Sequence, residues 1–327
     1  MRKGVNPEKN KTDFNKRYFH RIIIPVYIPD SKSEFYRNSI DVFEVALTSL
    51  LNSINPITTA VTVIDNSSKE EVKFILKENI KKVDKVVNYN SNKGKVYAVI
   101  SELRAAYEPF VTVADADVLF LEGWENAVFS LFKEFPKAGV VAPLPCSGLA
   151  FSHNTSLFFD NYLIGKIKYG SVVKEEDSQL YIEGLGNSAI LDRNNRNFHW
   201  YEKQYYLGKE VKAVVGAGHF VATYRAAIFK GETSFPEIKF KNGYEDQFID
   251  VLADKKGYYR LSTTETFAYH IGNNLDKNVE ILSKRKGEKL KLKLKLINNL
   301  TLNRKRRWTS HYLRQIVFKV IKKTMHL

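Results

Sequence analysis

Cysteine is almost absent from this chain of 327 residues, which contains only Cys146. A single thiol cannot form an internal disulfide, which fits a reducing compartment, and we expect it to be buried as a small apolar side chain. No apolar run approaches the roughly 18 residues that span a bilayer. Residues 1–17 also lack the apolar segment of a secretory signal. The sequence therefore predicts a cytoplasmic protein without a membrane-spanning helix.

Net charge is unevenly distributed along the chain. The whole chain carries +15, but residues 1–283 hold 36 Lys and Arg against 35 Asp and Glu. Residues 284–327 hold 15 Lys and Arg against one acid, Glu288. A charge that is confined to one terminus is typical of a targeting or docking segment.

Strand-like and helix-like segments alternate after a basic N-terminal arm at residues 1–18. Strands are predicted at 21–28, 60–64, 83–89 and 110–114, and helices at 40–54, 69–79 and 96–107. This alternation predicts an α/β fold with a mostly parallel sheet and helices on both faces. Neither G-x-G-x-x-G nor G-x-x-x-x-G-K-[ST] occurs, which counts against a dinucleotide-dependent enzyme and a P-loop protein.

Two acids, Asp115 and Asp117, follow the buried strand at 110–114. In an open α/β sheet, ligands bind outside the carboxyl ends of the strands. Two neighbouring carboxylates repel unless a cation stands between them, and Mg²⁺ prefers such oxygen ligands. The alternative is an ordinary turn, where Asp is common.

The order of several short motifs resembles family 2 glycosyltransferases of the GT-A fold. The motifs are Ile24-Pro25-Val26-Tyr27, Val63-Ile64-Asp65-Asn66-Ser67, Asn92-Lys93-Gly94, Asp115-Ala116-Asp117, Gly243-Tyr244-Glu245-Asp246-Gln247-Phe248 and Tyr269-His270-Ile271-Gly272. The resemblance covers roughly residues 20–275. It implies transfer of a sugar from a nucleotide diphosphate to an acceptor hydroxyl, with Mn²⁺ or Mg²⁺ as cofactor.

The resemblance also implies a role for individual residues. Asp117 and His270 would bind the metal, and Asp115 would face the metal, the ribose or the sugar. The residues implied in nucleotide-sugar binding are Pro25, Tyr27, Asp65, Lys93, Gly94 and Gly218. For Asp65 an alternative is to cap the helix at 69–79, and the role of His219, beside Gly218, stays open.

Glu245 and Asp246 form the second acidic pair and precede an amphipathic helix. Acids at a helix start are stabilised by the helix dipole, which is a purely structural explanation. By resemblance, Asp246 is the general base that removes the proton of the attacking hydroxyl, in preference to Glu245. A carboxylate base there belongs to a single displacement with inversion.

The chain is expected to consist of three parts, which are the basic arm at 1–18, a GT-A domain at 19–275 and a tail at 276–327. A GT-A domain at 19–275 would contain a nucleotide-sugar half, 19–143, and an acceptor half, 144–275. The acceptor half contains many aromatic residues at 144–215, which suit sugar or lipid-linked acceptors but equally suit a core. The tail, 276–327, would be a membrane-association segment.

The tail combines basic and apolar residues. Lysine and leucine alternate at 289–296, a basic cluster lies at 304–307 beside Trp308, and a helical stripe follows. The stripe consists of Leu313, Ile316, Val317, Val320 and Ile321. Such segments lie on anionic membranes. Nucleic acid is the competing partner, and a packed accessory helix is the third possibility.

Together these patterns predict a metal-dependent, inverting hexosyl- or N-acetylhexosaminyltransferase at the inner face of the membrane. Its acceptor would be a glycan or lipid-linked molecule in surface polysaccharide synthesis. The alternatives are a glycosyltransferase that modifies nucleic acid or protein, and a non-catalytic protein that binds sugar nucleotides or membranes. The sequence leaves the sugar, the linkage and the oligomeric state open.

Overall fold

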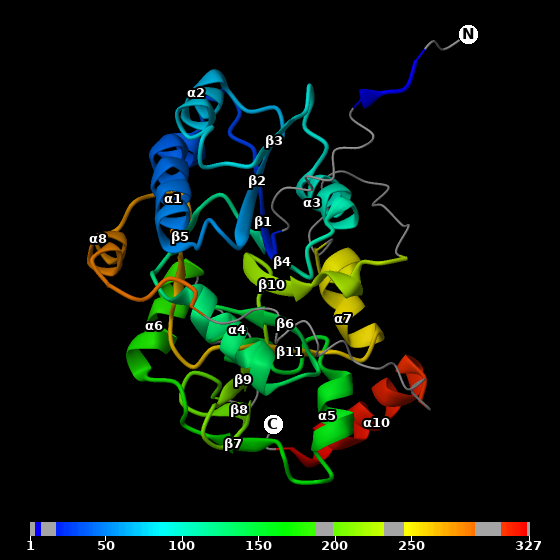
Figure 1. Cartoon of the computed structure of the whole chain (residues 1–327). Helices are drawn as coiled ribbons and strands as arrows, with labels where there is room; N and C mark the ends of the chain where they lie inside the picture. The colour runs from blue at the N-terminus through cyan, green and yellow to red at the C-terminus, as the bar shows by residue number, and fades with distance from the viewer. Residues whose placement is uncertain (1–3, 8–17, 187–198, 232–244, 292–308, 326–327) are drawn as a thin grey trace.

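The structure is a computed structural model that describes residues 4–7, 18–186, 199–231, 245–291 and 309–325. These residues form a large β-sheet with helices packed on it, which confirms the predicted α/β fold class (Figure 1). Among the described helices, none has the length and apolar character needed to cross a membrane.

The first half of the sheet is parallel, as the alternation of strands and helices predicts. Its elements are β1 (His20–Val26), α1 (Ser39–Ser53), β2 (Thr59–Asp65), α2 (Glu70–Glu78), β3 (Lys85–Asn88), α3 (Lys95–Ala105) and β4 (Phe110–Ala114). The strand order is β3-β2-β1-β4, and each neighbouring pair is parallel. Strands β2 and β4 are buried along their whole length, which explains why apolar residues predominate in both.

The second half of the sheet is mixed, and it lies beyond the residues whose alternation predicts a parallel sheet. Its strands are β6 (Ala138–Ala142), β7 (Lys168–Gly170), β8 (Gln204–Leu207), β9 (Ala213–Val215), β10 (Val221–Arg225) and β11 (Tyr259–Ser262). Strand β10 runs antiparallel between β4 and β6. Strands β8 and β9 pair antiparallel across a tight turn. Gly208 permits that turn, because its φ is 93° and a Cβ there would lie 1.9 Å from the Val211 carbonyl oxygen.

The remaining elements surround the sheet. The helices are α4 (Trp124–Glu134), α5 (Thr155–Asn161), α6 (Glu175–Gly184), α7 (Val251–Lys255), α8 (Lys277–Ser283) and α10 (His311–Thr324). Short 3₁₀ turns lie at η2 (Glu34–Tyr36), η3 (Ser147–Leu149) and η5 (Ala226–Ile228), and a π-helical turn, η6 (Asp246–Asp250), precedes α7. A separate pair of antiparallel strands consists of β5 (Val118–Phe120) and β12 (Ala268–His270).

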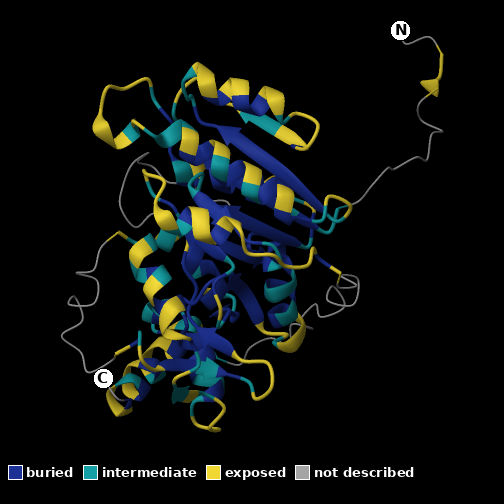
Figure 2. Ribbon diagram, turned by 90° about the vertical axis from the view of Figure 1, so that its left-hand side faces the viewer, coloured by how far each residue is buried: buried dark blue, intermediate teal, exposed yellow. Residues whose placement is uncertain are grey.

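The core follows the sheet, and the outer faces of the helices are exposed (Figure 2). Cys146 is buried, as predicted, and burial raises the pKa of its thiol to about 12. Several aromatic residues of the segment 144–215 fill the core beneath α5. Phe158 and Tyr205, for example, pack with ring centroids 5.9 Å apart.

The described parts of the tail pack against the body. Leu282 of α8 and Leu290 are buried, and the Asn55 side chain donates a hydrogen bond of 3.0 Å to the Leu290 carbonyl. Helix α10 packs beside α5 (Figure 1). The predicted boundary at residue 276 therefore does not coincide with a break in packing. The basic cluster at 304–307 and most of the arm at 1–18 lie outside the described residues.

Candidate active site

The site lies at the carboxyl end of β4. Strand β1 lies between β2 and β4 in the sheet. From β1 the chain continues to β2 and β3 on one side and then returns to β4 on the other side. Open α/β sheets bind ligands at the point where the strand order reverses in this way. The Asp115 backbone N–H donates a hydrogen bond of 2.7 Å to the Phe220 carbonyl. This bond holds the Asp115–Asp117 turn against the loop that enters β10.

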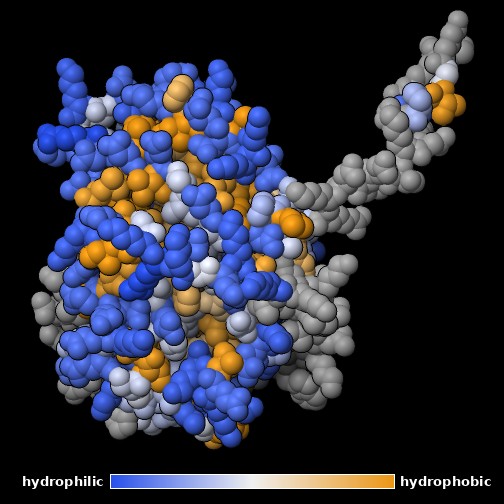
Figure 3. Space-filling view, turned by 60° about the vertical axis from the view of Figure 1, so that its left-hand side comes forward, coloured by the Kyte–Doolittle hydropathy of each residue, from blue (hydrophilic) through white to orange (hydrophobic). Residues whose placement is uncertain are grey.

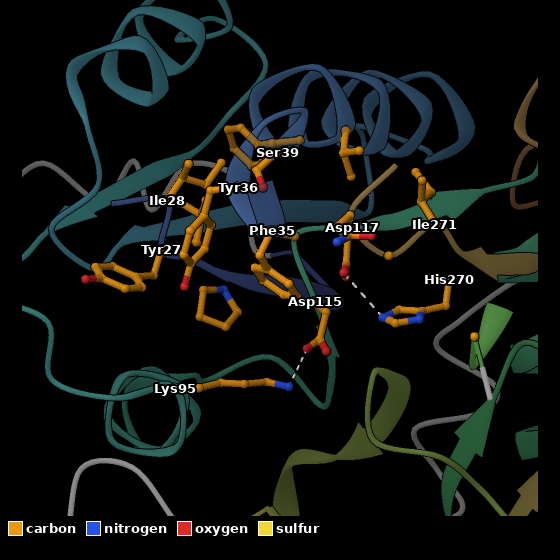
Figure 4. Close-up of a pocket in the computed structure, with 18 of the residues that line it drawn as sticks. Tyr27, Ile28, Phe35, Tyr36, Ser39, Lys95, Asp115, Asp117, His270 and Ile271 are labelled. Carbon is orange, nitrogen blue, oxygen red and sulfur yellow. Dashed lines mark ion pairs between the residues drawn. The ribbon is translucent and has the colours of Figure 1, made fainter. Parts of the chain in front are cut away.

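Strand β12 brings a histidine to the two acids. His270 lies opposite Val118 in the β5–β12 pair, and its Nε2 atom is 3.3 Å from Oδ2 of Asp117 (Figure 4). Asp115, Asp117 and His270 each offer a ligand atom within 4.8 Å of the others. The three residues that the resemblance assigned to the metal are therefore brought together.

The orientation of His270 suits a metal ligand. Its Nδ1 atom lies 2.7 Å from the Gly184 carbonyl oxygen, which can only accept, so Nδ1 carries the proton and Nε2 faces the acids. A Cβ at Gly184 would lie 3.2 Å from the His270 carbonyl oxygen, so glycine permits this close approach. Although burial favours neutral imidazole, the hydrogen bond and charge of Asp117 raise the pKa of His270 to about 9.

One carboxylate oxygen of the site has no hydrogen-bond partner among the described residues. Asp117 Oδ1 is buried and accepts no hydrogen bond from any described residue. Burial also raises the pKa of Asp115, an effect that Lys95 opposes and Asp117 reinforces. Buried polar atoms are normally satisfied, so an oxygen-preferring divalent cation fits this donor set of two carboxylates and an imidazole.

Lys95 is the main residue that the sequence reasoning missed. It begins α3, and its Nζ lies 2.5 Å from Asp115 Oδ1 (Figure 4). The same Nζ lies 3.2 Å from Glu245 Oε1. Although burial disfavours the ammonium, these two carboxylates raise the pKa of Lys95. The predicted Lys93 is not among the residues that line the cleft. Gly94, with a φ of 83°, directly precedes α3. A glycine at the start of a helix was the feature of the sequence that could have indicated Lys95 as a site residue.

The acids open into a cleft of about 660 Å³. Pro25 and Tyr27 line it, as the resemblance implied, and Phe35 and Tyr36 add aromatic rings that the sequence analysis did not assign (Figure 4). On one face of the molecule, apolar side chains gather in patches between hydrophilic ones (Figure 3). The cleft thus combines aromatic and apolar walls with a charged end.

Four predicted binding residues, Asp65, Lys93, Gly94 and Gly218, lie away from the cleft wall. Asp65 is buried, and its Oδ1 accepts a hydrogen bond of 2.8 Å from the Ser68 backbone N–H. It closes this turn rather than capping α2, whose first turn has no side-chain cap, because Asp readily bonds to nearby backbone N–H groups. The adjacent Asn66 lines the cleft instead. Gly218 packs near Cys146, whose Sγ would lie 3.5 Å from a Cβ there.

The two residues of the second acidic pair, Glu245 and Asp246, contact different partners. Glu245 contacts Lys95, which lowers the pKa of Glu245 despite its burial. Asp246 is half exposed, and its Oδ1 lies 2.5 Å from Nε2 of His153. Gly243 and Tyr244 of the same motif lie outside the described residues. The structure thus links Glu245 to Asp115 through Lys95 and leaves Asp246 beside a histidine.

A fully compensated acid lies deeper in the same region. Asp250 Oδ1 accepts hydrogen bonds from Arg260 at 2.8 Å and from Tyr224 at 3.1 Å. Its Oδ2 lies 3.4 Å from Nδ1 of His219. Although burial opposes ionisation, Arg260 and His219 hold the pKa of Asp250 well below its usual value. In return, the hydrogen bond to Asp250 raises the pKa of His219.

Comparison with known families agrees with this geometry. The model of glycosyl transferase family 2 matches residues 35–179, a range that includes Lys95, Asp115 and Asp117. Residues 35–179 therefore match the family that the motifs of the sequence resemble.

Individual relatives match over part of the chain. Polypeptide N-acetylgalactosaminyltransferase 18 of Mus musculus and that of Homo sapiens are each 31% identical over 128 residues, which are 37% of this chain. The matched region spans 20% of the length of these curated relatives.

Solved structures are similar at low identity. The crystal structure of S. aureus TarS 1-349 has a TM-score of 0.45 and 16% identity, over 76% of this chain and 59% of that one. The mannosyltransferase PcManGT from Pyrobaculum calidifontis, in complex with GDP-Man and Mn²⁺, has a TM-score of 0.41 and 17% identity, over 77% of this chain and 56% of that one.

Proposed function

We propose that the protein is a metal-dependent, inverting glycosyltransferase. It would transfer a hexosyl or N-acetylhexosaminyl group from a nucleotide diphosphate sugar to a hydroxyl of a glycan or lipid-linked acceptor in surface polysaccharide synthesis. The observation that carries this proposal is the cluster of Asp115, Asp117 and His270 at the end of β4. One oxygen of Asp117 in this cluster has no hydrogen-bond partner in the part of the chain that the structure describes. The family 2 match around these acids supports it.

The residues of the cleft have distinct roles in this proposal. Asp117 and His270, with Asp115, would hold Mn²⁺ or Mg²⁺, which as a Lewis acid stabilises the charge of the departing diphosphate. Lys95 favours the ionised form of Asp115 and orients it through its 2.5 Å contact. Tyr27 lies on the wall of the cleft, where its ring can contact the nucleotide or the sugar.

The proton of the acceptor needs a base in a single displacement. Asp246 is half exposed and held at 2.5 Å by His153, so its carboxylate is oriented without being buried. In the proposed step the acceptor oxygen attacks the anomeric carbon, Asp246 takes the hydroxyl proton, and the bond to the nucleotide diphosphate breaks. A positioned carboxylate base contributes roughly 10²–10⁴-fold to such a rate.

A panel of nucleotide sugars, assayed with Mn²⁺ and the purified full chain, tests the activity and identifies the donor. With that donor, Asp246→Asn should lower the transfer rate by roughly 10²–10⁴-fold while donor affinity changes little. NMR of the product should show inverted anomeric configuration. Retained configuration would contradict the role of Asp246, and no turnover of any nucleotide sugar would favour the non-catalytic alternative.

Protein is the second candidate acceptor. It is favoured by the names of the curated relatives, which are polypeptide N-acetylgalactosaminyltransferases. Peptide and lipid-linked glycan acceptors, offered in parallel with the identified donor, decide between the two classes.

We also propose that residues 284–327 bring the enzyme to an anionic membrane at the cytoplasmic face. The support is the concentration of 15 basic residues against one acid in this segment, since each Lys or Arg near an anionic surface contributes about 1 kcal/mol. Nucleic acid is the competing polyanion. Co-sedimentation with anionic vesicles, against binding to DNA and RNA at matched salt, separates the two.

A further inference from the structure

Helix α10 has one face fixed to the body. Phe318 and Ile321 are buried, and the Phe318 ring lies 5.1 Å from that of Phe158 on α5. The Arg314 guanidinium is buried as well and donates hydrogen bonds to the carbonyls of Asp254 and Lys255, at 3.3 and 3.1 Å. These contacts decide which side of the helix points outward.

The opposite face of α10 is apolar and exposed. Its members are Tyr312, Leu313, Ile316 and Val320, which are 72%, 44%, 43% and 61% exposed. At about 100° per residue these four positions occupy a single stripe, away from the buried face. The stripe predicted from the sequence is therefore divided, because Ile321 packs inward while Leu313, Ile316 and Val320 face outward.

A loop of the body lies beside this stripe. The Tyr162 hydroxyl lies 3.1 Å from Oγ1 of Thr324, and Thr324 follows Val320 by one helical turn. The next two residues of the loop, Leu163 and Ile164, are 79% and 62% exposed. The turn after α5 and the C-terminal end of α10 both lie at the lower edge of the molecule in Figure 1.

Basic side chains accompany both apolar elements. Lys319 and Lys323 are exposed on α10, which contains no acid. Lys166 on the loop and Lys168 at the start of β7 are exposed as well. Exposed apolar side chains among lysines fit an anionic bilayer, because the apolar side chains can enter its hydrocarbon region while the lysines contact its anionic headgroups. A second copy of the chain fits less well, because a symmetric contact brings the same lysines face to face.

We infer that the exposed stripe of α10 and the Leu163–Ile164 loop form one membrane-docking face. The inference rests on the proposed membrane location and adds that the body itself contacts lipid. The catalytic domain is then held in a set orientation on the bilayer instead of being tethered by the basic tail alone.

The first test compares two pairs of substitutions in the full chain. Vesicles of phosphatidylglycerol and phosphatidylcholine are the probe. Leu163→Ser with Ile164→Ser should weaken co-sedimentation about tenfold. The matched control is Phe74→Ser with Ile80→Ser, on and just beyond α2 at the opposite end of the molecule, where the side chains are 65% and 57% exposed. The control should bind vesicles as the unmodified chain does.

The second test detects insertion directly. Because Cys146 is buried and burial raises the pKa of its thiol to about 12, a cysteine introduced as Ile164→Cys should be labelled selectively by an environment-sensitive dye. Its emission should shift to the blue when the anionic vesicles are added. A dye attached to Ile80→Cys should show no shift.

The possible outcomes are distinct. If the unmodified chain ignores anionic vesicles, the proposed membrane location itself fails. If the chain binds but the loop variant binds equally well and its dye does not shift, the composite face is overturned and the tail acts alone. A dimer in light scattering that the loop variant converts to monomer would also overturn it, in favour of self-association.

Discussion

Two acidic groups in this protein are built from similar residues and are satisfied differently. Asp250 lies in a closed network in which Arg260, Tyr224 and His219 engage both of its oxygens. Asp117 faces a histidine through one oxygen, while its other oxygen is buried without a partner in the described chain. A buried acid that is fully compensated belongs to the scaffold, whereas one that is not compensated needs something from outside the chain.

The electrostatics of the two groups agree with this difference. Arg260 and His219 hold the pKa of Asp250 low even though it is buried. At the cleft, burial raises the pKa of Asp115 in spite of Lys95. The fold itself thus stabilises Asp250 as an anion. At the cleft, a bound cation would stabilise the charges of Asp115 and Asp117.

Removing a cleft acid should break function without breaking the fold. Asp117→Asn keeps the shape of the side chain but removes a metal ligand, and metal-assisted charge stabilisation is worth several kcal/mol. We expect transfer to fall by about 10³-fold or more, and Mn²⁺ binding measured by calorimetry to be lost. The thermal midpoint should change little, because relief of the repulsion with Asp115 offsets the loss of the charge that faces His270. Full turnover in excess chelator would refute the metal.

Removing the scaffold acid should have the opposite outcome. Asp250→Asn leaves Arg260 as an uncompensated buried charge, which typically costs about 3–5 kcal/mol of unfolding free energy. Urea unfolding at pH 7 measures this loss, and Asp117→Asn is the matched control that should show none. An equal loss in both variants would remove the distinction between the two acidic groups.

The pH dependence of the Asp250 effect follows from its lowered pKa. A carboxyl whose pKa is lower in the folded state stabilises the fold above its unfolded pKa of about 3.9 and loses this contribution as the pH falls further. The gap in unfolding free energy between the unmodified chain and Asp250→Asn should therefore narrow below about pH 4. It should also decrease as the pH rises above the unfolded pKa of His219, about 6.5, because the hydrogen bond to Asp250 raises the pKa of His219 and this contribution is lost when the imidazole deprotonates.

Sequence patterns predict the parts of this protein that depend on neighbouring residues. The apolar run before Asp115 and the alternation of strands with helices locate the parallel half of the sheet and the acids at its edge. The mixed half depends on β10 pairing with β4, more than a hundred residues away. No local period encodes such a pairing, so the sequence patterns did not predict the antiparallel strands of that half.

The same reason separates the site residues that were predicted from those that were missed. His270 was reached through a family motif, since its contact with Asp117 spans 153 residues. Asp65 was assigned to the nucleotide, but its own turn offers the nearer Ser68 N–H at 2.8 Å. Lys95 was missed because its partners, Asp115 and Glu245, meet it only through the fold.

Substitutions of Lys95 and Lys93 have the smallest expected effect on transfer. They also distinguish the residue that the sequence predicted, Lys93, from the residue that the structure indicates, Lys95. Lys95→Met should lower transfer about tenfold, because it removes one charged hydrogen bond from Asp115 and leaves Glu245 unpaired. Mn²⁺ affinity should rise slightly in the same variant, since the acids lose a competing cation. Lys93→Met, two residues earlier and away from the cleft wall, should change transfer less than twofold. Steady-state kinetics of both variants with one donor, beside Mn²⁺ titrations, measures each effect. If Lys93→Met were the damaging change, the nucleotide contact predicted from the sequence would hold, and the bridge from Asp115 through Lys95 to Glu245 would be incidental to catalysis.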